Sequence, residues 1–513
     1  MERSKNSLRN ILFGLTGQVI NILMSFVTRT VFLRTLSSVY LGVNGLFTNI
    51  LMVFSLADLG VGTAIIYALY RPIAEGDRRK IQALMNMYQR AYLLIGCVIL
   101  LLGLGMMPFI KVFVKTTQDI PNLRLIFMIF VVNTASTYFF AYKGTLITAH
   151  QRNYIVTNVV YTTSILCYAV QIVIMKATHN YILTLSIQVG TNILQNIITM
   201  AIANRMYPYI KQRNNELLAP EERRKIYRNM SSLMFYRTGQ VVINGTDSIT
   251  ISSLVGVTQA GIYSNYLLLT TTVKNLMQQV FSAITASIGN LAAMESNEMK
   301  YQMYKSVYFG NFWMFGFGAV CFFVLFNPFM ILWAGVDMML SSKEVFFISL
   351  NFYLIGMRNV NLVFRDTMGV FREGRFVPII SAAVNIGVSV IATIKFGLIG
   401  AFIGTTISMV TTLVWMEPVV LFKYGFKRKV WPYFVKYLIY FSATALATAI
   451  TWLIAHQFTV NSLSCFIGKL VVCLITPNLL FFLLFGRTKE FQLVYEKVMA
   501  VTKSRLKKRR AAK

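Results

Sequence analysis

The amino-acid sequence predicts an all-α protein that crosses a membrane many times. Of its 513 residues, 56% are hydrophobic and only 13% are charged, and the mean hydropathy is +0.60. A soluble domain usually carries about 25% charged residues. Apolar runs of about 20 residues, the length that a spanning helix needs, recur along the chain. This pattern is typical of a polytopic membrane protein and excludes a soluble globular enzyme.

The apolar runs predict about 14 transmembrane helices. The second and eighth runs are long enough to be tilted or broken. The predicted ranges are 9–33, 42–70, 86–110, 123–143, 155–175, 182–204, 230–253, 259–290, 306–331, 344–366, 378–394, 398–422, 433–455 and 464–486.

The distribution of basic residues predicts the orientation. With the N-terminus inside, 35 of the 49 Lys and Arg residues fall in inner segments and 6 in outer segments. Positive charge concentrates on the cytoplasmic side of membrane proteins, so both termini are expected in the cytoplasm. The net charge of +31 therefore indicates membrane topology and not a nucleic-acid partner. The basic tail at 487–513 predicts an amphipathic segment held at the inner surface by anionic membrane lipids.

A weak internal repeat predicts two lobes of six helices each. The tetrapeptide TGQV at 16–19 recurs at 238–241, and Leu41-Gly42-Val43 has a loose counterpart in Ala260-Gly261-Ile262. An even number of helices per copy gives parallel repeats, a plan common among transporters. The predicted organisation is an N-lobe (1–204), a basic cytoplasmic linker (205–229), a C-lobe (230–422), two additional helices (423–486) and the basic tail (487–513).

No familiar catalytic or metal-binding pattern appears. The three histidines are far apart, and the five cysteines lie in or beside apolar runs without metal-ligand spacing. Walker A, HExxH and GxSxG motifs are missing from the sequence, so we expect no metal, no cofactor and no enzymatic activity. The GxxxG match at 400–404 predicts close helix packing.

Charged residues inside the apolar runs are the candidate functional residues. A Lys or Arg at a helix centre costs roughly 2.5–3.5 kcal/mol and usually marks a transport pathway. Since cations outnumber acids, the interior is expected to keep positive charge and to bind an anionic substrate, for which arginine is well suited when the anion is phosphate. The cations are Arg29, Arg34, Arg237, Lys274, Arg358 and Arg365, of which Arg34 lies just past the first helix, and the acids are Asp58, Asp247 and Asp366.

Each of these residues also has a simpler interpretation. Arg365 and Asp366 are neighbours and could form a local ion pair, while Arg29 and Arg34 could both sit at the outer interface. Lys274 and Arg237 could extend to the membrane surface, as long basic side chains often do. Asp58 and Asp247 could bind a coupling cation or proton, or could simply neutralise an arginine.

Several segments resemble bacterial polysaccharide flippases. The similarity extends over nearly the whole chain and is to the Wzx-type (O-antigen) flippases of the multidrug/oligosaccharidyl-lipid/polysaccharide exporter superfamily. Asp58 stands where similar sequences often have Glu. The segments that carry the resemblance are YLGVNGLFTNIL (40–51), SLADLGVGTAIIYALYRPIAEGD (55–77), YFFAYKGTLITAHQRNYI (138–155), NGTDSITIS (244–252), FRDTMGVFREGRFVPI (364–379) and WMEPVVLFKYGF (415–426).

This resemblance implies a function that composition does not reach. It implies two six-helix lobes in a V with two added helices, in a bacterial inner membrane. The substrate would be an oligosaccharide linked through pyrophosphate to undecaprenol, and alternating access driven by H⁺ or Na⁺ would move it to the outer leaflet. Other membrane proteins of polysaccharide assembly are expected partners. A peptidoglycan-precursor flippase and a multidrug or organic-cation exporter of the same superfamily remain the alternatives.

Overall fold

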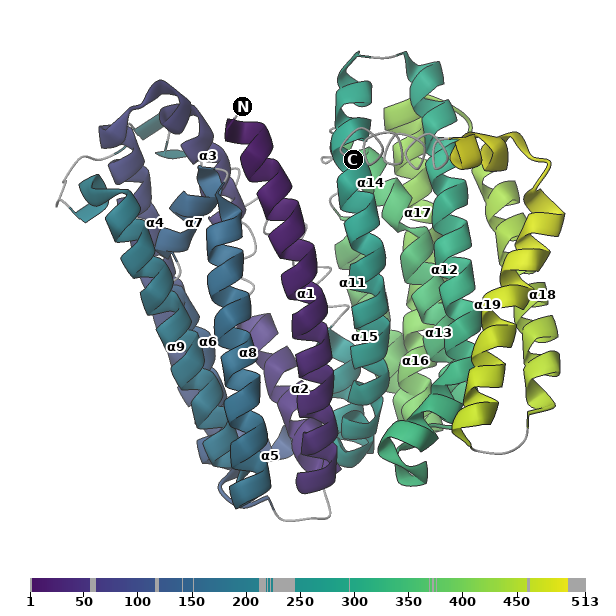
Figure 1. Ribbon diagram of the computed structural model, residues 1–513, viewed down its shortest axis with the longest axis horizontal. Coiled ribbons are helices and arrows are strands. Elements are labelled where there is room, and N and C mark those ends of the chain that lie inside the picture. Colours follow the sequence, from purple (N-terminus) through teal and green to yellow (C-terminus); the bar gives the residue numbers. More distant parts are fainter. Residues whose placement is uncertain are drawn as a thin grey trace, which may run out of the picture. The chain divides into compact units, whose positions relative to one another are not determined.

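In the computed structural model, the regular secondary structure of the described residues is all helical (Figure 1). Those residues divide into two units, 1–264 and 265–513, and the division falls inside one long helix, α11 (Val257–Met294). The predicted linker at 205–229 lies largely outside the described residues, and the predicted lobe boundaries stay a prediction. The residues not described are 1, 56–60, 116–119, 141, 151, 212–217, 219, 222, 225–244, 295, 369, 371–372, 375, 459–461 and 497–513.

Within the described residues, eight helical stretches are long and apolar enough to cross a membrane, and a ninth is bent by 46° between α6 and α7. The predicted fold class, an all-α membrane protein with many spans, is confirmed. The eight are Arg78–Phe113, Asn153–Thr178, Asn297–Ala334, Ser342–Thr367, Val377–Phe396, Leu398–Phe426, Trp431–His456 and Leu463–Phe485.

Unit 1 is a bundle in which α1 packs along α8, α4 along α6, and α9 against both α6 and α8. Its short helices, α2, α3 and α7, lie between the long ones. The helices are α1 (Glu2–Thr35), α2 (Ser38–Phe54), α3 (Val61–Glu75), α4 (Arg78–Met106), α5 (Ile110–Phe113), α6 (Leu123–Phe140), α7 (Tyr142–Ala149), α8 (Asn153–Thr178) and α9 (Tyr181–Met206).

Two apolar clusters hold unit 1 together. In one, Phe47 of α2 packs edge-to-face on Phe127 of α6, with ring centroids 5.0 Å apart. In the other, Leu69 of α3 and Leu84 of α4 are buried with Leu146 of α7. Because lipid is as apolar as these side chains, close packing and not escape from water holds such helices together.

The long apolar run predicted as one helix at 42–70 is two helices. α2 ends at Phe54, and Ser55 caps it by donating its hydroxyl to the Leu51 carbonyl, 2.9 Å away. A second helix, α3, begins at Val61 and contains Pro72. The acid predicted in this region, Asp58, lies outside the described residues.

Unit 2 is built from antiparallel neighbours: α12 with α13, α15 with α16, and α18 with α19. The last two helices both pack on α12. The helices are α12 (Asn297–Ala334), α13 (Ser342–Met357), α14 (Asn359–Thr367), α15 (Val377–Phe396), α16 (Leu398–Ser408), α17 (Val414–Val420), α18 (Trp431–His456) and α19 (Leu463–Phe485).

The turn between α15 and α16 is one of the tightest in unit 2. Gly397 sits in it with φ 66°, a conformation that glycine adopts without strain. A Cβ on Gly400 would overlap the backbone of Ala392, and one on Gly404 would overlap the backbone of Ser389. The close helix packing predicted from the GxxxG match is therefore confirmed.

The run predicted at 398–422 is irregular at its second half. Two single-turn π-helices, Met409–Leu413 and Leu421–Phe426, flank α17. Pro418 lies inside α17 and cannot donate a backbone hydrogen bond. Such wide turns are common at functional positions and change the direction in which side chains point.

Candidate functional site

Arg29 lies inside unit 1, where side chains from other helices surround it. It is half-buried on α1 and donates a hydrogen bond to the Ser264 hydroxyl. Ser264 in turn donates to the Gly261 carbonyl at 2.6 Å. Tyr181 of α9 lies close enough to interact electrostatically with the guanidinium. Of the two interpretations of Arg29, this placement favours an internal residue over one at the lipid interface.

A close backbone approach brings Ser264 to Arg29. A Cβ on Gly261 of α11 would lie 3.1 Å from the Gly42 nitrogen and would overlap the Ser38 carbonyl oxygen. A Cβ on Gly42 would likewise overlap the carbonyl oxygen of Val257. Only glycine at both positions allows α2 and the start of α11 to approach this closely. The two glycines that the sequence pairs as repeat counterparts are therefore neighbours in space.

Arg34 and Asp247 lie in different environments. Arg34 is exposed in the last turn of α1, where the negative end of the helix dipole stabilises its positive charge. Asp247 is half-buried in the helical segment 245–250 and interacts electrostatically with Tyr263. Since Tyr263 precedes Ser264, the start of α11 contacts both Asp247 and Arg29.

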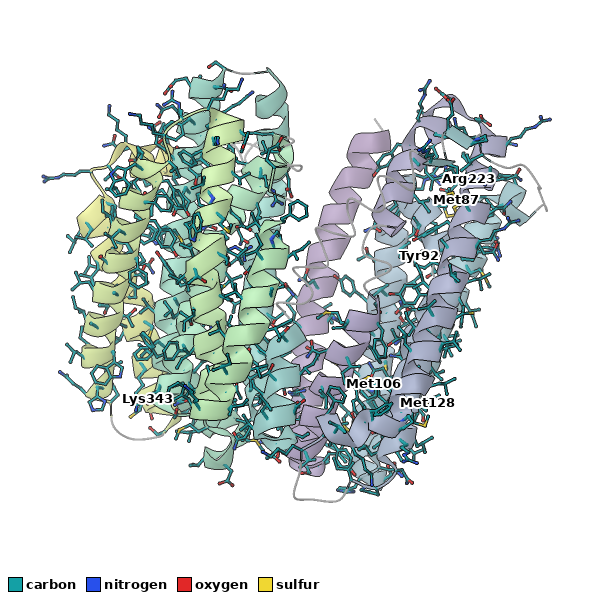
Figure 2. All side chains as sticks on the ribbon, turned by 180° about the vertical axis from the view of Figure 1, so that it is seen from behind. Met87, Tyr92, Met106, Met128, Arg223 and Lys343 are labelled. Carbon is teal, nitrogen blue, oxygen red and sulfur yellow. The ribbon has the colours of Figure 1, made fainter. Side chains whose placement is uncertain are left out.

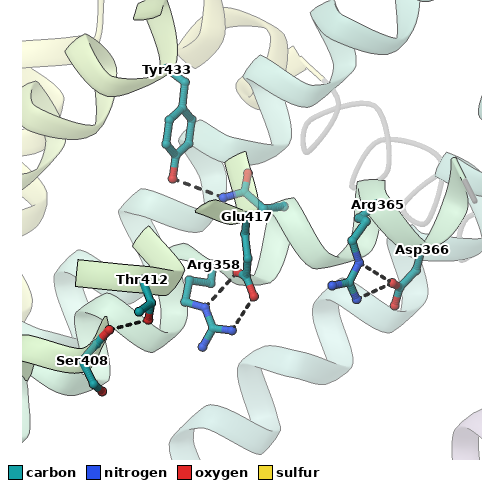
Figure 3. Close-up of polar contacts among 8 residues, drawn as sticks. Arg358, Arg365, Asp366, Ser408, Thr412, Glu417 and Tyr433 are labelled. Carbon is teal, nitrogen blue, oxygen red and sulfur yellow. Dashed lines mark hydrogen bonds and ion pairs between the residues drawn. The ribbon is translucent and has the colours of Figure 1, made fainter. Parts of the chain in front are cut away.

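In unit 2, Arg358 forms a two-pronged ion pair with Glu417 (Figure 3). The Arg358 Nε donates to Glu417 Oε2 at 2.9 Å and its Nη2 donates to Oε1 at 2.7 Å. The two side chains are 11% and 3% exposed. The run predicted at 344–366 is one spanning stretch, Ser342–Thr367, with an interruption of one residue here, because α13 ends at Met357 and α14 begins at Asn359. Arg358 therefore projects from a helix junction.

A buried polar network continues from this ion pair. Asn361 donates to the Tyr433 hydroxyl at 3.2 Å and accepts from the Tyr304 hydroxyl at 2.7 Å. Tyr433 also lies close enough to Glu417 and Arg358 for electrostatic interaction. Helices α12, α14, α17 and α18 each contribute a side chain, so the network joins four parts of unit 2.

The other predicted residues of unit 2 differ in their contacts. Arg365 is buried and pairs with its neighbour Asp366 at 2.8 Å, while the Asp366 side chain is 51% exposed. Lys274 of α11 is half-buried and makes no hydrogen bond or ion pair with any residue that the structure describes. Arg237 lies outside the described residues.

Among the titratable groups outside the spanning helices, His150 and Glu490 have shifted pKa values. His150 follows α7 and stacks on Tyr207, with ring centroids 4.4 Å apart. Burial, together with the nearby Arg152, lowers the pKa of His150 below its ordinary value. Glu490 follows α19, and although burial raises its pKa, the hydrogen bond and charge of Lys436 outweigh burial and hold that pKa below the ordinary range.

Sequence reasoning missed Glu417 as a site residue. The residue lies within the apolar run at 398–422, so a rule that searches apolar runs for acids would have found it. Its pairing with Arg358, 59 positions away, has no signal in helical periodicity. Tyr181, which lies beside Arg29, was also missed because a tyrosine near a helix start is common in membrane proteins.

A family model matches more than half of this chain. The model is described as "Polysaccharide biosynthesis protein" and matches residues 7–288. No curated protein matches the sequence significantly.

Solved structures of transporters share the fold at low sequence identity. A structure titled "Lipid II flippase MurJ, inward closed conformation" has a TM-score of 0.68 at 11% identity and covers 93% of this chain and 99% of its own. An inward-facing multidrug resistance MATE family transporter of the MOP superfamily has a TM-score of 0.58 at 14% identity, and the match covers 79% of this chain and 96% of that transporter. The Vibrio cholerae MATE transporter VcmN in the bent form has a TM-score of 0.52 at 12% identity, and the match covers 83% of this chain and 99% of that transporter.

Proposed function

Because the chain belongs to the polysaccharide biosynthesis protein family, we propose that it is a flippase for an undecaprenyl-pyrophosphate-linked oligosaccharide. Family and fold support a membrane transporter of the MOP superfamily over an enzyme. The observation that carries the proposal is the family match over residues 7–288. The lipid-linked glycan moves from the inner to the outer leaflet of a bacterial plasma membrane, and both termini face the cytoplasm.

Lys274 has no acidic partner among the residues that the structure describes, and this supports an anionic substrate. An ammonium inside an apolar helix is costly unless it meets water or an anion, and no described residue supplies that anion. The pyrophosphate of the substrate is such an anion. Arg29 adds a planar guanidinium whose five donors match phosphate oxygens. In this proposal each of the two residues is a candidate contact for the pyrophosphate.

Arg358 and Arg365 have a different role in this proposal. Glu417 matches the charge of Arg358, and Asp366 matches that of Arg365. Neither arginine adds net positive charge to the interior while its pair is closed. They reach substrate only in a state of the transport cycle in which these pairs have opened.

The driving force in this proposal is an ion gradient. Asp247 is half-buried beside Tyr263 and Asp58 lies in an apolar run, and a carboxylate in such a place binds H⁺ or Na⁺ more readily than one in bulk water. Binding and release of the ion on opposite sides would bias the alternation between inward-facing and outward-facing states.

The test is the leaflet in which lipid-linked oligosaccharide accumulates when the protein is depleted. Intermediates trapped on the inner leaflet, lost again on re-expression, support the proposal and yield the substrate by mass. Normal outer-leaflet glycan with altered sensitivity to organic cations would overturn it in favour of an exporter. Trapped peptidoglycan precursor, recognised by its pentapeptide mass, would reassign the substrate.

A further inference from the structure

A cavity of about 150 Å³ lies within unit 2, between helices α12, α13, α18 and α19. It sits where these helices end in turns: α12 ends at Ala334, α13 begins at Ser342, α18 ends at His456 and α19 begins at Leu463. An apolar cavity of about this size accepts a group as large as benzene. The cavity is separate from Arg29, Lys274 and the Arg358–Glu417 pair, none of which lines it.

Apolar residues line the cavity together with the polar Asn327 and Ser342 and with two basic residues, which we call the basic rim. Phe323 and Val324 of α12 and Val345 of α13 form the apolar side. His456 of α18 and Lys469 of α19 supply nitrogen atoms, and neither forms an ion pair with an acid in the described part of the chain. This asymmetry fits an amphipathic ligand whose charged group is anionic.

Additional features of the rim strengthen this assignment. His456 stacks on Trp452, with ring centroids 5.1 Å apart, and tryptophan is enriched at the depth of lipid headgroups. Lys343 is exposed at the same end of unit 2 (Figure 2). The nearby acid Glu344 is engaged in capping α13 through Ser341. Outside the cavity, Glu344 and the exposed Asp337 offset the charge of Lys343, but the described residues that line the cavity itself include no acid.

We propose that this cavity binds the phosphate of an anionic membrane phospholipid. Lys469 and His456 contact the phosphate, as basic pockets between transmembrane helices do with lipid headgroups. The acyl chains extend along the exposed apolar surface of α18 and α19, which includes Leu453 at 60% and Ile467 at 51% exposure. A free phosphate ion would use only the basic rim, whereas a phospholipid uses both sides of the cavity. The bound lipid thereby joins the last two helices to α12 and α13.

The test measures lipid binding to the purified full-length chain in detergent micelles. Native mass spectrometry with phosphatidylglycerol as the probe gives the Kd of the retained lipid, and phosphatidylcholine is the neutral comparison. We expect tighter binding of phosphatidylglycerol. Lys469→Gln is expected to weaken it about tenfold, equivalent to about 1.4 kcal/mol. Lys469→Arg, which keeps the charge, should bind phosphatidylglycerol like the wild type. His456→Gln should weaken binding of this lipid without affecting folding, because His456 is exposed.

The matched control is Lys395→Gln, which removes an exposed lysine from the last turn of α15 in the same unit. This variant should bind phosphatidylglycerol like the wild type. The proposal is overturned if Lys469→Gln and His456→Gln both keep wild-type affinity, or if the two lipids bind equally. Inorganic phosphate that displaces the lipid at millimolar concentration, with the same dependence on Lys469, would reassign the site to a free anion.

Discussion

Arg358 donates two parallel hydrogen bonds to Glu417 in a part of unit 2 where both side chains are almost fully buried. A paired guanidinium and carboxylate lose their hydration together and recover much of it from one another. Removing one partner takes the opposite charge of this pair away from the other. The pair is therefore a point where a single substitution has a large and asymmetric effect.

Arg358→Ala and Glu417→Ala are each expected to lower the free energy of unfolding by about 3–5 kcal/mol, because one buried charge loses the opposite charge of this ion pair. The double variant Arg358→Met/Glu417→Leu should recover most of that loss, because no charge stays buried. Denaturant unfolding in micelles gives the values. Glu75→Gln is the control, since the exposed Arg71–Glu75 pair is worth at most about 1 kcal/mol. If the double variant lost as much free energy of unfolding as the two single variants together, burial of an uncompensated charge would not be the cause.

Gly42→Ala is expected to destabilise the protein by about 1–3 kcal/mol, because the new methyl group meets the Val257 carbonyl oxygen. Gly45→Ala on the same helix is the matched control. Nothing lies within 4 Å of its added Cβ, and alanine favours the helix. Thermal unfolding of the two variants should shift in opposite directions. Equal shifts would show that the approach of α11 to α2 is looser than described.

Arg29→Ala and Lys274→Ala are expected to reduce glycan export at least about tenfold, since a hydrogen bond to a charged group contributes about 1.5–3 kcal/mol. Arg34→Ala removes an exposed arginine from the same helix as Arg29 and should leave export near normal. Surface glycan, normalised to the amount of protein in the membrane, is the measurement. Full export by both Arg29→Ala and Lys274→Ala would exclude the assigned anion contacts.

Stability is expected to fall as the pH drops below about 6.5, the ordinary pKa of histidine. Burial lowers the pKa of His150 in the folded protein, so the unfolded chain binds the proton more readily. The contribution of neutral His150 is complete above the unfolded pKa and is lost as the pH falls toward the folded pKa. The decrease in unfolding temperature from about pH 7.5 to 5.5 should be smaller in His150→Gln. An unchanged decrease would assign the pH dependence to groups other than His150.

Most of the helices could be predicted because membrane helices need long apolar stretches. The predicted range 155–175 lies within α8, and the predicted range 464–486 differs from α19 by one residue at each end. The breaks at Ser55 and Arg358 were harder to place, since apolar composition continues through both. The predicted helix at 230–253 lies mostly outside the described residues.

The candidate site was less predictable because its geometry depends on pairings between distant residues. Charge inside apolar runs correctly singled out Arg29 and Arg358 as internal. Their partners, Ser264 and Glu417, come from helices 235 and 59 positions away. A hydroxyl in a membrane helix carries no distinguishing signal, and Ser264 could be found only from the structure. The local pair Arg365–Asp366 is the exception, because adjacent residues need no tertiary information.

The last two helices are joined to unit 2 by stacked and edge-on rings. Tyr440 of α18 lies flat on Phe312 of α12, with ring centroids 4.2 Å apart and planes 9° apart, and Phe485 of α19 packs on the same ring. Trp313 also donates to Asn478 of α19 at 2.7 Å. In a bilayer, lipid tails would cover Phe312 almost as well as these rings do, but they offer no acceptor for the Trp313 indole. A chain shortened before Trp431 would therefore lose close side-chain packing and a hydrogen bond, while lipid would replace most of the apolar cover. The α18–α19 hairpin occupies a position that lipid molecules would otherwise fill.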